Sequence, residues 1–214
     1  MTPVVFDLDG TLIDSLPDVT KAVNLLLEEV GHPLVDRILV NTLVGSGERV
    51  LMDRLIAATD LSEADYDHLL QRFIEHYKIA ALDTELFPGA MDALESLKGK
   101  GVPIGLCTNK PRAPLVPTLE AAGLETIFDV VLAGDDLDRR KPDPAPLFHC
   151  FQRLGSEKGV YVGDSEVDAE TAKRAAVPFL IFEHGIRVSA IEDIPHTARF
   201  GAFGDLEALL ESLI

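Results

Sequence analysis

Short apolar runs alternate with amphipathic stretches along most of this chain. The apolar runs predict buried strands at residues 4–6, 102–107, 129–133, 159–162 and 178–182. Apolar residues with helical spacing follow at 89–101, 111–123, 144–154, 171–176 and 205–213. This alternation favours an α/β fold in which helices cover both faces of a mostly parallel sheet.

Residues 15–83 break the alternation because they show helical spacing without any strand signal. Helices are predicted to start near Pro17, Asp36, Gly47 and Ser62. We therefore predict a helical cap, residues 15–83, inserted into an α/β core made of residues 1–14 and 84–214. The segment 183–204 is predicted to be a loop, with His184 and His196 at the surface.

Polar residues directly follow the predicted strands. A parallel sheet gathers the carboxyl ends of its strands at one edge, where ligands bind in such folds. The side chains brought together there would be Asp7, Asp9, Thr108, Asn109, Asp135, Asp136 and Asp164. Thr108 and Asn109 also precede a helix start at Pro111. Their side chains and the free backbone N–H groups can donate hydrogen bonds to phosphate oxygens, although an ordinary helix cap has the same pattern.

Asp7 and Asp9 are separated by one residue at the end of a buried strand. Two carboxylates this close repel each other, and each loses hydration when buried, unless a cation lies between them. Oxygen ligands of this kind suit Mg²⁺, so we predict a Mg²⁺ site here. The alternative is a strand-to-turn connection whose two acids are solvated.

The composition is that of a globular protein, with 47% hydrophobic and 26% charged residues among 214. A formal net charge of −17 argues against nucleic acid and anionic membranes as partners. Cys107 and Cys150 form no CxxC pair, which predicts free thiols and a reducing cytoplasm. No signal peptide or membrane-spanning run is visible. A small anionic substrate would need a local pocket of positive potential.

The run Asp7-Leu8-Asp9-Gly10-Thr11-Leu12 resembles the first motif of the haloacid dehalogenase superfamily of phosphatases. Later stretches resemble its second, third and fourth motifs in the same order: Thr108-Asn109, Lys141-Pro142-Asp143-Pro144 and Gly163-Asp164-Ser165-Glu166-Val167-Asp168. The resemblance implies a Rossmann-like core and a Mg²⁺-dependent phosphatase. The second aspartate, which the dehalogenases of this superfamily lack, is present as Asp9.

The resemblance also implies a mechanism of two displacements. Asp7 would be the nucleophile that forms an aspartyl-phosphate. Asp9 would protonate the leaving group and then activate water. Lys141 would offset the negative charge of the carboxylates and the phosphate, whereas the neighbouring Arg139 and Arg140 fit a solvated basic turn.

The ligands of Mg²⁺ and of the phosphoryl group follow from the same resemblance. Mg²⁺ would be bound by the Asp7 carboxylate, the Asp9 backbone carbonyl and Asp164. Asp168 would hold a metal-bound water or Lys141, or else act only as an acid at a helix start. The phosphoryl group would be bound by Gly10, Thr108 and Asn109.

The substrate is predicted from the segment 44–51, which resembles a turn of phosphoglycolate phosphatases. We expect 2-phosphoglycolate, with Arg49 binding its carboxylate, although Arg49 could equally be an exposed helix residue. The alternatives are another small sugar-phosphate phosphatase, a β-phosphoglucomutase-like phosphomutase and a non-catalytic regulatory module. A monomer or homodimer is expected.

Overall fold

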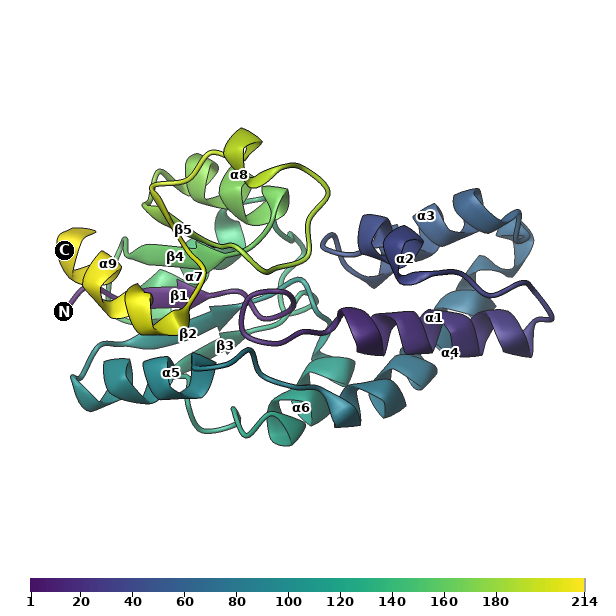
Figure 1. Cartoon of the computed structure of the whole chain (residues 1–214), viewed down its shortest axis with the longest axis horizontal. Coiled ribbons are helices and arrows are strands. Elements are labelled where there is room, and N and C mark those ends of the chain that lie inside the picture. The colour runs from purple at the N-terminus through teal and green to yellow at the C-terminus, as the bar shows by residue number, and fades with distance from the viewer. Residues whose placement is uncertain (214) are drawn as a thin grey trace.

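The computed structural model describes residues 1–213, which form an α/β core beside a group of helices (Figure 1). The core contains a 6-stranded parallel sheet with the order β3-β2-β1-β4-β5-β6. Its strands are β1 (Val4–Phe6), β2 (Ile104–Cys107), β3 (Val130–Leu132), β4 (Val160–Gly163), β5 (Phe179–Phe182) and β6 (Ala198–Phe200). The predicted α/β fold is confirmed.

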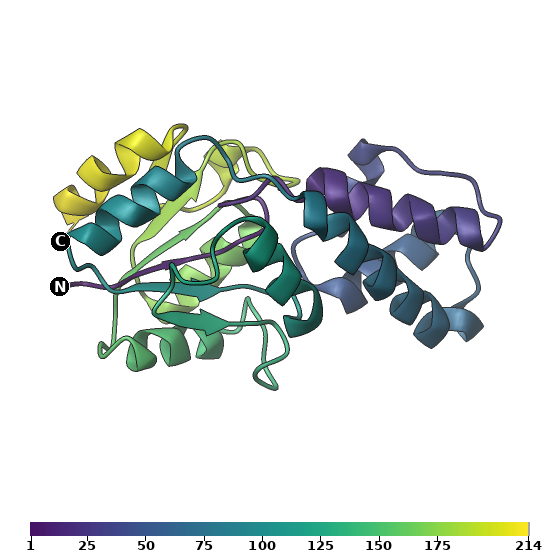
Figure 2. The ribbon, with the colours of Figure 1, turned by 90° about the horizontal axis from the view of Figure 1, so that it is seen from below.

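Both faces of the sheet are buried along β1, β2, β4 and β5, which explains why these strands are almost entirely apolar. In β1, Val4 and Phe6 pack on one face and Val5 on the other, as the two-residue repeat of a strand requires. One face packs against α5 (Ala90–Gly99), α6 (Arg112–Ala121) and α9 (Leu206–Leu213). The opposite face packs against α7 (Ala145–Arg153) and α8 (Glu166–Ala175) (Figure 2). Cys107 and Cys150 are buried free thiols, as predicted.

The segment 183–204 is more ordered than the predicted loop. It contains β6, which pairs with β5, and the short turns Ile191–Asp193 and Phe203–Asp205. The strand was missed because it has three residues and places the charged Arg199 between Ala198 and Phe200. His184 is exposed and His196 is half-buried.

Helices α1 (Leu16–Glu29), α2 (Arg37–Leu43), α3 (Glu48–Thr59) and α4 (Tyr66–Ala80) lie on one side of the core (Figure 1). Together with the turns Glu63–Asp65 and Ala81–Asp83 they are called the helical unit, residues 16–83. Its apolar faces form a hydrophobic cluster of their own, to which the core contributes Ile186. The Asp36 carboxylate caps α2 by accepting a hydrogen bond from the Leu39 N–H.

Two short linkers connect the helical unit to the core, and they run side by side. The Asp14 N–H donates to the Glu85 carbonyl at 3.1 Å, and the Phe87 N–H donates to the Leu12 carbonyl at 2.9 Å. Within residues 1–213, no helix combines the length and apolar character that a bilayer crossing requires.

Candidate active site

Asp7 and Asp164 lie side by side because they follow neighbouring strands. β1 pairs with β4, Phe6 is in register with Val162, and the Asp7 N–H donates to the Val162 carbonyl at 2.9 Å. The chain leaves β1 towards β2 and returns to the other side of β1 as β4. This reversal of strand order opens a crevice at the carboxyl ends of the strands, where ligands bind in open parallel sheets.

Gly10 allows the loop after β1 to pass close to Asp164. Its φ of +82° lies in the left-handed region, and a Cβ atom here would lie 2.3 Å from Asp164 Oδ2. Asp164 is fixed from two further sides, since Oδ1 accepts from the Thr11 hydroxyl at 2.7 Å and Oδ2 from the Ile186 N–H at 2.6 Å. Any larger residue at position 10 would displace this carboxylate.

Lys141 reaches the carboxylate that follows β1. Its Nζ lies 2.8 Å from Asp7 Oδ1 and donates to Asp168 Oδ1, also at 2.8 Å. Tyr161 completes the group, because its hydroxyl accepts from Lys141 and donates to Asp168 Oδ1 at 2.7 Å. Asp168 Oδ2 accepts from the Ser165 hydroxyl at 2.7 Å, which fixes Asp168 at the start of α8. Among the roles predicted for Asp168, the structure shows the one in which Asp168 holds Lys141.

Burial and neighbouring charges shift the pKa values of the ionisable groups at this site. Burial raises the pKa of Asp7 to about 7 against the partly compensating charge of Lys141. Burial, Asp168 and Asp7 raise the pKa of Asp164 well above its ordinary value. Burial also acts against the charged forms of Asp168 and Lys141, but their mutual attraction lowers the pKa of Asp168 and raises that of Lys141.

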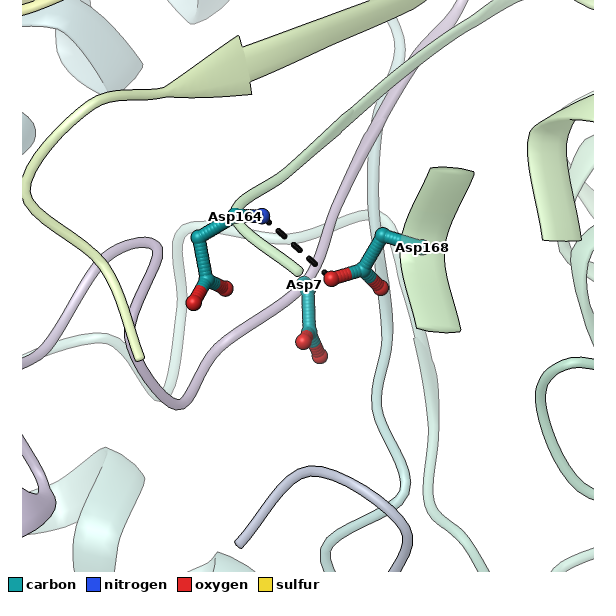
Figure 3. A group of neighbouring side chains, drawn as sticks. All are labelled: Asp7, Asp164 and Asp168. Carbon is teal, nitrogen blue, oxygen red and sulfur yellow. Dashed lines mark hydrogen bonds between the residues drawn. The ribbon is translucent and has the colours of Figure 1, made fainter. Parts of the chain in front are cut away.

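The geometry fits a divalent cation. Carboxylate oxygens of Asp7, Asp164 and Asp168 lie within 4.8 Å of one another in a buried place (Figure 3). Asp168 is already bonded to Lys141, Tyr161 and Ser165, so Asp7 and Asp164 are the better candidates for ligands. Buried carboxylates this close to one another need a compensating positive charge, and hard oxygen donors suit Mg²⁺.

Thr108 and Asn109 are buried beside this acidic group, with exposed fractions of 4% and 6%. The Asn109 side-chain amide donates to the Lys141 carbonyl at 3.0 Å and to the Gly45 carbonyl at 3.2 Å. Asn109 thus ties together the core loop that carries Lys141 and the turn before α3. Thr108 lines the same cavity as Asp7, and its hydroxyl accepts from the Lys110 N–H at 3.1 Å.

The most informative residue that sequence reasoning missed is Lys110. It is 4% exposed, and its Nζ donates to Asp9 Oδ1 at 3.0 Å and to the Tyr77 hydroxyl. The Tyr77 hydroxyl in turn donates to Asp9 Oδ1 at 3.3 Å. Its position directly after Thr108-Asn109 could have identified Lys110 as a site residue. No such signal marks Tyr77, which has only the ordinary apolar spacing of α4.

A further contact between core and helical unit involves Arg140, which was interpreted as part of a solvated turn. Arg140 makes two hydrogen bonds of 3.1 Å to the carboxylate of Glu48, in the first turn of α3. The Glu48 side chain is only 9% exposed. Arg139 does project to solvent and pairs with Asp143.

The structure does not bring all predicted residues to the site. Arg49 is exposed, and its backbone carbonyl accepts from the Tyr66 hydroxyl at 3.2 Å. Asp135 and Asp136 are exposed and bind Arg112 at the start of α6. These three side chains do not face the cavity described next.

One cavity joins the core to the helical unit. The core contributes its strand-end residues, and the helical unit contributes Val19, Glu48, Leu51, Phe73 and Tyr77. The core wall is therefore polar and acidic, and the facing wall is largely apolar. A ligand held here would contact both parts of the chain.

Comparisons with known proteins agree with this geometry. The family model described as haloacid dehalogenase-like hydrolase matches residues 4–182. A phosphoglycolate phosphatase of Cereibacter sphaeroides is 42% identical over 217 aligned residues, covering 100% of both chains. A phosphoglycolate phosphatase of Rhodospirillum rubrum is 40% identical, covering 95% of this chain and 88% of the relative.

A solved structure shows the same fold. The crystal structure of a predicted phosphoglycolate phosphatase from Haemophilus somnus has a TM-score of 0.91 at 30% identity, covering 98% of this chain and 97% of that one. The present chain therefore belongs to the haloacid dehalogenase-like hydrolase family and resembles phosphoglycolate phosphatases along its whole length.

Proposed function

We propose that this protein is a Mg²⁺-dependent phosphatase that hydrolyses 2-phosphoglycolate through an aspartyl-phosphate on Asp7. The observation that carries the proposal is the group formed by Asp7, Asp9, Asp164 and Lys141 at the crevice beside β1. The full-length similarity to phosphoglycolate phosphatases supports the choice of substrate.

Asp7 is the nucleophile in this proposal. Its carboxylate lines the cavity, and Lys141 lies 2.8 Å from it. The ammonium group favours the ionised, nucleophilic form and offsets charge that accumulates when phosphate approaches. Thr108 and the backbone at the start of α6 donate to the phosphoryl oxygens. When bound, Mg²⁺ would be held by Asp7, Asp164 and the Asp9 carbonyl, and would supply further positive charge at the phosphoryl group.

Asp9 transfers the protons. It lines the same cavity as Asp7 and is more exposed than Asp7, which gives the leaving oxygen access to its carboxyl group. Asp9 donates a proton to the departing alkoxide and, as a carboxylate, then takes a proton from the water that attacks the aspartyl-phosphate. The bond to phosphorus therefore passes from the ester oxygen to Asp7 and then to water.

The helical unit acts as a cap over this chemistry. Its apolar residues face the acidic core wall across the cavity. Closure would exclude bulk water while the phosphoryl group is transferred to Asp7, and would hold the leaving group in place. We place the cap at residues 15–83 and the core at 1–14 and 84–214.

The test is phosphate release, with and without Mg²⁺, from 2-phosphoglycolate, sugar phosphates, nucleotides and p-nitrophenyl phosphate. We expect Mg²⁺-dependent release that is fastest from 2-phosphoglycolate and is abolished in Asp7→Asn. Asp135→Asn is a matched control, because Asp135 also follows a strand but is exposed and outside the cavity.

Other results would point to the alternatives. Fast release from sugar phosphates instead would make this a sugar-phosphate phosphatase. Isomerisation of a sugar phosphate without net release would indicate a phosphomutase. The absence of both would leave a non-catalytic regulatory module.

A further inference from the structure

The cavity is lined by more acidic than basic side chains. Its lining includes the acids Asp7, Asp9, Glu48 and Asp164. Among the lining residues in the described part of the chain, Lys110 is the only cation. A substrate with two anionic groups, such as 2-phosphoglycolate, needs positive charge at both ends, and Mg²⁺ with Lys141 can serve only the phosphoryl end.

Lys110 lies near the place that the carboxylate of 2-phosphoglycolate would occupy. Its Nζ lies 3.0 Å from Asp9 Oδ1, and Asp9 must contact the leaving oxygen in order to protonate it. In 2-phosphoglycolate a single methylene group separates that oxygen from the carboxylate. A cation that touches Asp9 is therefore within reach of a carboxylate that is one carbon away from the leaving oxygen.

The contacts of Lys110 hold its side chain in a position suited to binding an anion. An ammonium group has three donors, and two hydrogen bonds of Lys110 go to Asp9 and Tyr77. Its Nζ lies 4.1 Å from the centre of the Tyr77 ring, which stabilises the charge in a buried place. Because Tyr77 belongs to α4, the group is complete only when the helical unit lies against the core.

We propose that Lys110, with the Tyr77 hydroxyl, forms the subsite that binds the substrate carboxylate and thereby determines specificity. This inference rests on the proposed function and assigns to Lys110 the role that sequence reasoning gave to Arg49. A neutral group at the same place would gain nothing from the Lys110 charge, which Asp9 alone would then face, so uncharged analogues should react more slowly.

The experiment compares 2-phosphoglycolate with 2-hydroxyethyl phosphate, in which a hydroxymethyl group replaces the carboxylate. The readout is the ratio of the two kcat/KM values with Mg²⁺ present. Any loss through the contact with Asp9 affects both substrates and cancels in this ratio. In Lys110→Met we expect the ratio to fall by at least about 30-fold, with most of the change in KM for 2-phosphoglycolate.

Further variants keep the test decisive. Lys110→Arg should retain part of the selectivity, and Tyr77→Phe should lower it by roughly fivefold. Lys173→Met is the matched control, since Lys173 is an exposed lysine of α8. Thermal melting reports whether each variant is folded.

The outcomes separate the two proposals. A wild-type enzyme that does not prefer 2-phosphoglycolate contradicts the proposed substrate and, with it, the subsite. A wild-type enzyme that does prefer it, combined with folded Lys110→Met and Lys110→Arg variants that keep the same ratio, overturns the subsite alone. Lys110 would then act only on Asp9.

Discussion

Asp168 holds Lys141 through a hydrogen bond of 2.8 Å between Oδ1 and Nζ, while the same ammonium group lies 2.8 Å from Asp7. One buried lysine thus connects a carboxylate at the start of α8 to the proposed nucleophile. Asp168 does not line the cavity, so its effect on the reaction should pass through Lys141.

Asp168→Asn should lower both kcat and stability. Removing one partner of a buried ion pair leaves the other charge uncompensated, so we expect a loss of about 3 kcal/mol in the free energy of unfolding. The misplaced Lys141 should lower kcat by roughly 100-fold. Tyr161→Phe removes a hydroxyl bonded to the same two residues but leaves the ion pair between them intact, so it should have a smaller effect on both quantities. Denaturant melts and phosphate release measure them; equal kcat in wild type and Asp168→Asn would contradict this role.

Asp9→Asn should separate the two displacements. p-Nitrophenolate leaves without needing a proton, so Asp7 can still attack p-nitrophenyl phosphate in this variant, whereas hydrolysis of the aspartyl-phosphate lacks its base. Rapid mixing should show a burst of p-nitrophenol of at most about one equivalent per protein, followed by slow turnover. Asp7→Asn should show no burst. A burst-free Asp9→Asn with unchanged turnover would remove Asp9 from the mechanism.

Mg²⁺ binding should become stronger as pH rises. The pKa of Asp7 is about 7 in the folded chain and 3.8 ordinarily. The folded state therefore binds a proton that the unfolded state releases, and the stability this contributes is lost as pH rises from about 4 to 7. Mg²⁺ competes with that proton, so it should raise Tm more at about pH 8 than at about pH 5. Asp7→Asn should reduce this difference, since only Asp164 then exchanges a proton for Mg²⁺; an equal Mg²⁺ effect at both pH values in the wild type would refute the prediction.

Arg140→Met should weaken substrate binding more than it changes kcat. Without Arg140, the mostly buried Glu48 carboxylate faces a cavity that must accept an anion. We expect KM for 2-phosphoglycolate to rise about tenfold. Adding Glu48→Gln should recover most of the loss, because the unpaired charge is then gone. A double variant no better than Arg140→Met would show that Arg140 acts otherwise than through Glu48.

Arg49→Met tests the prediction made from the sequence. Because Arg49 is exposed and outside the cavity lining, we expect the ratio of kcat/KM values for 2-phosphoglycolate and p-nitrophenyl phosphate to change less than about twofold. A large rise in KM for 2-phosphoglycolate alone would return the carboxylate-binding role to Arg49.

Asp7 and Asp164 could be predicted from sequence because strand geometry determines their positions, whereas Asp135 and Asp136, also predicted at strand ends, lie outside the cavity. Once β1 and β4 are recognised as parallel strands, Asp7 and Asp164 must share one edge of the sheet. Gly10 was part of the same motif, and its left-handed φ explains why glycine is required there. The local pattern also identified most helices of the core.

Contacts between the two parts of the chain could not be predicted in this way. The pairs Lys110–Tyr77 and Arg140–Glu48 depend on how the helical unit packs against the core. Tyr77 occupies a buried position of α4 that any large apolar residue could fill. β6 was missed because a three-residue strand at the edge of a sheet has too little pattern.

The paired linkers make the helical unit an exchangeable module. Its entry and exit lie next to each other, joined by the hydrogen bonds Asp14–Glu85 and Leu12–Phe87, and its hydrophobic cluster is largely separate from those of the sheet. A different insertion with closely spaced ends could therefore be grafted between the same linkers without disturbing the sheet. Such chimaeras would change which leaving group is accepted while keeping the phosphoryl-transfer machinery, a route by which one scaffold can diversify its substrates.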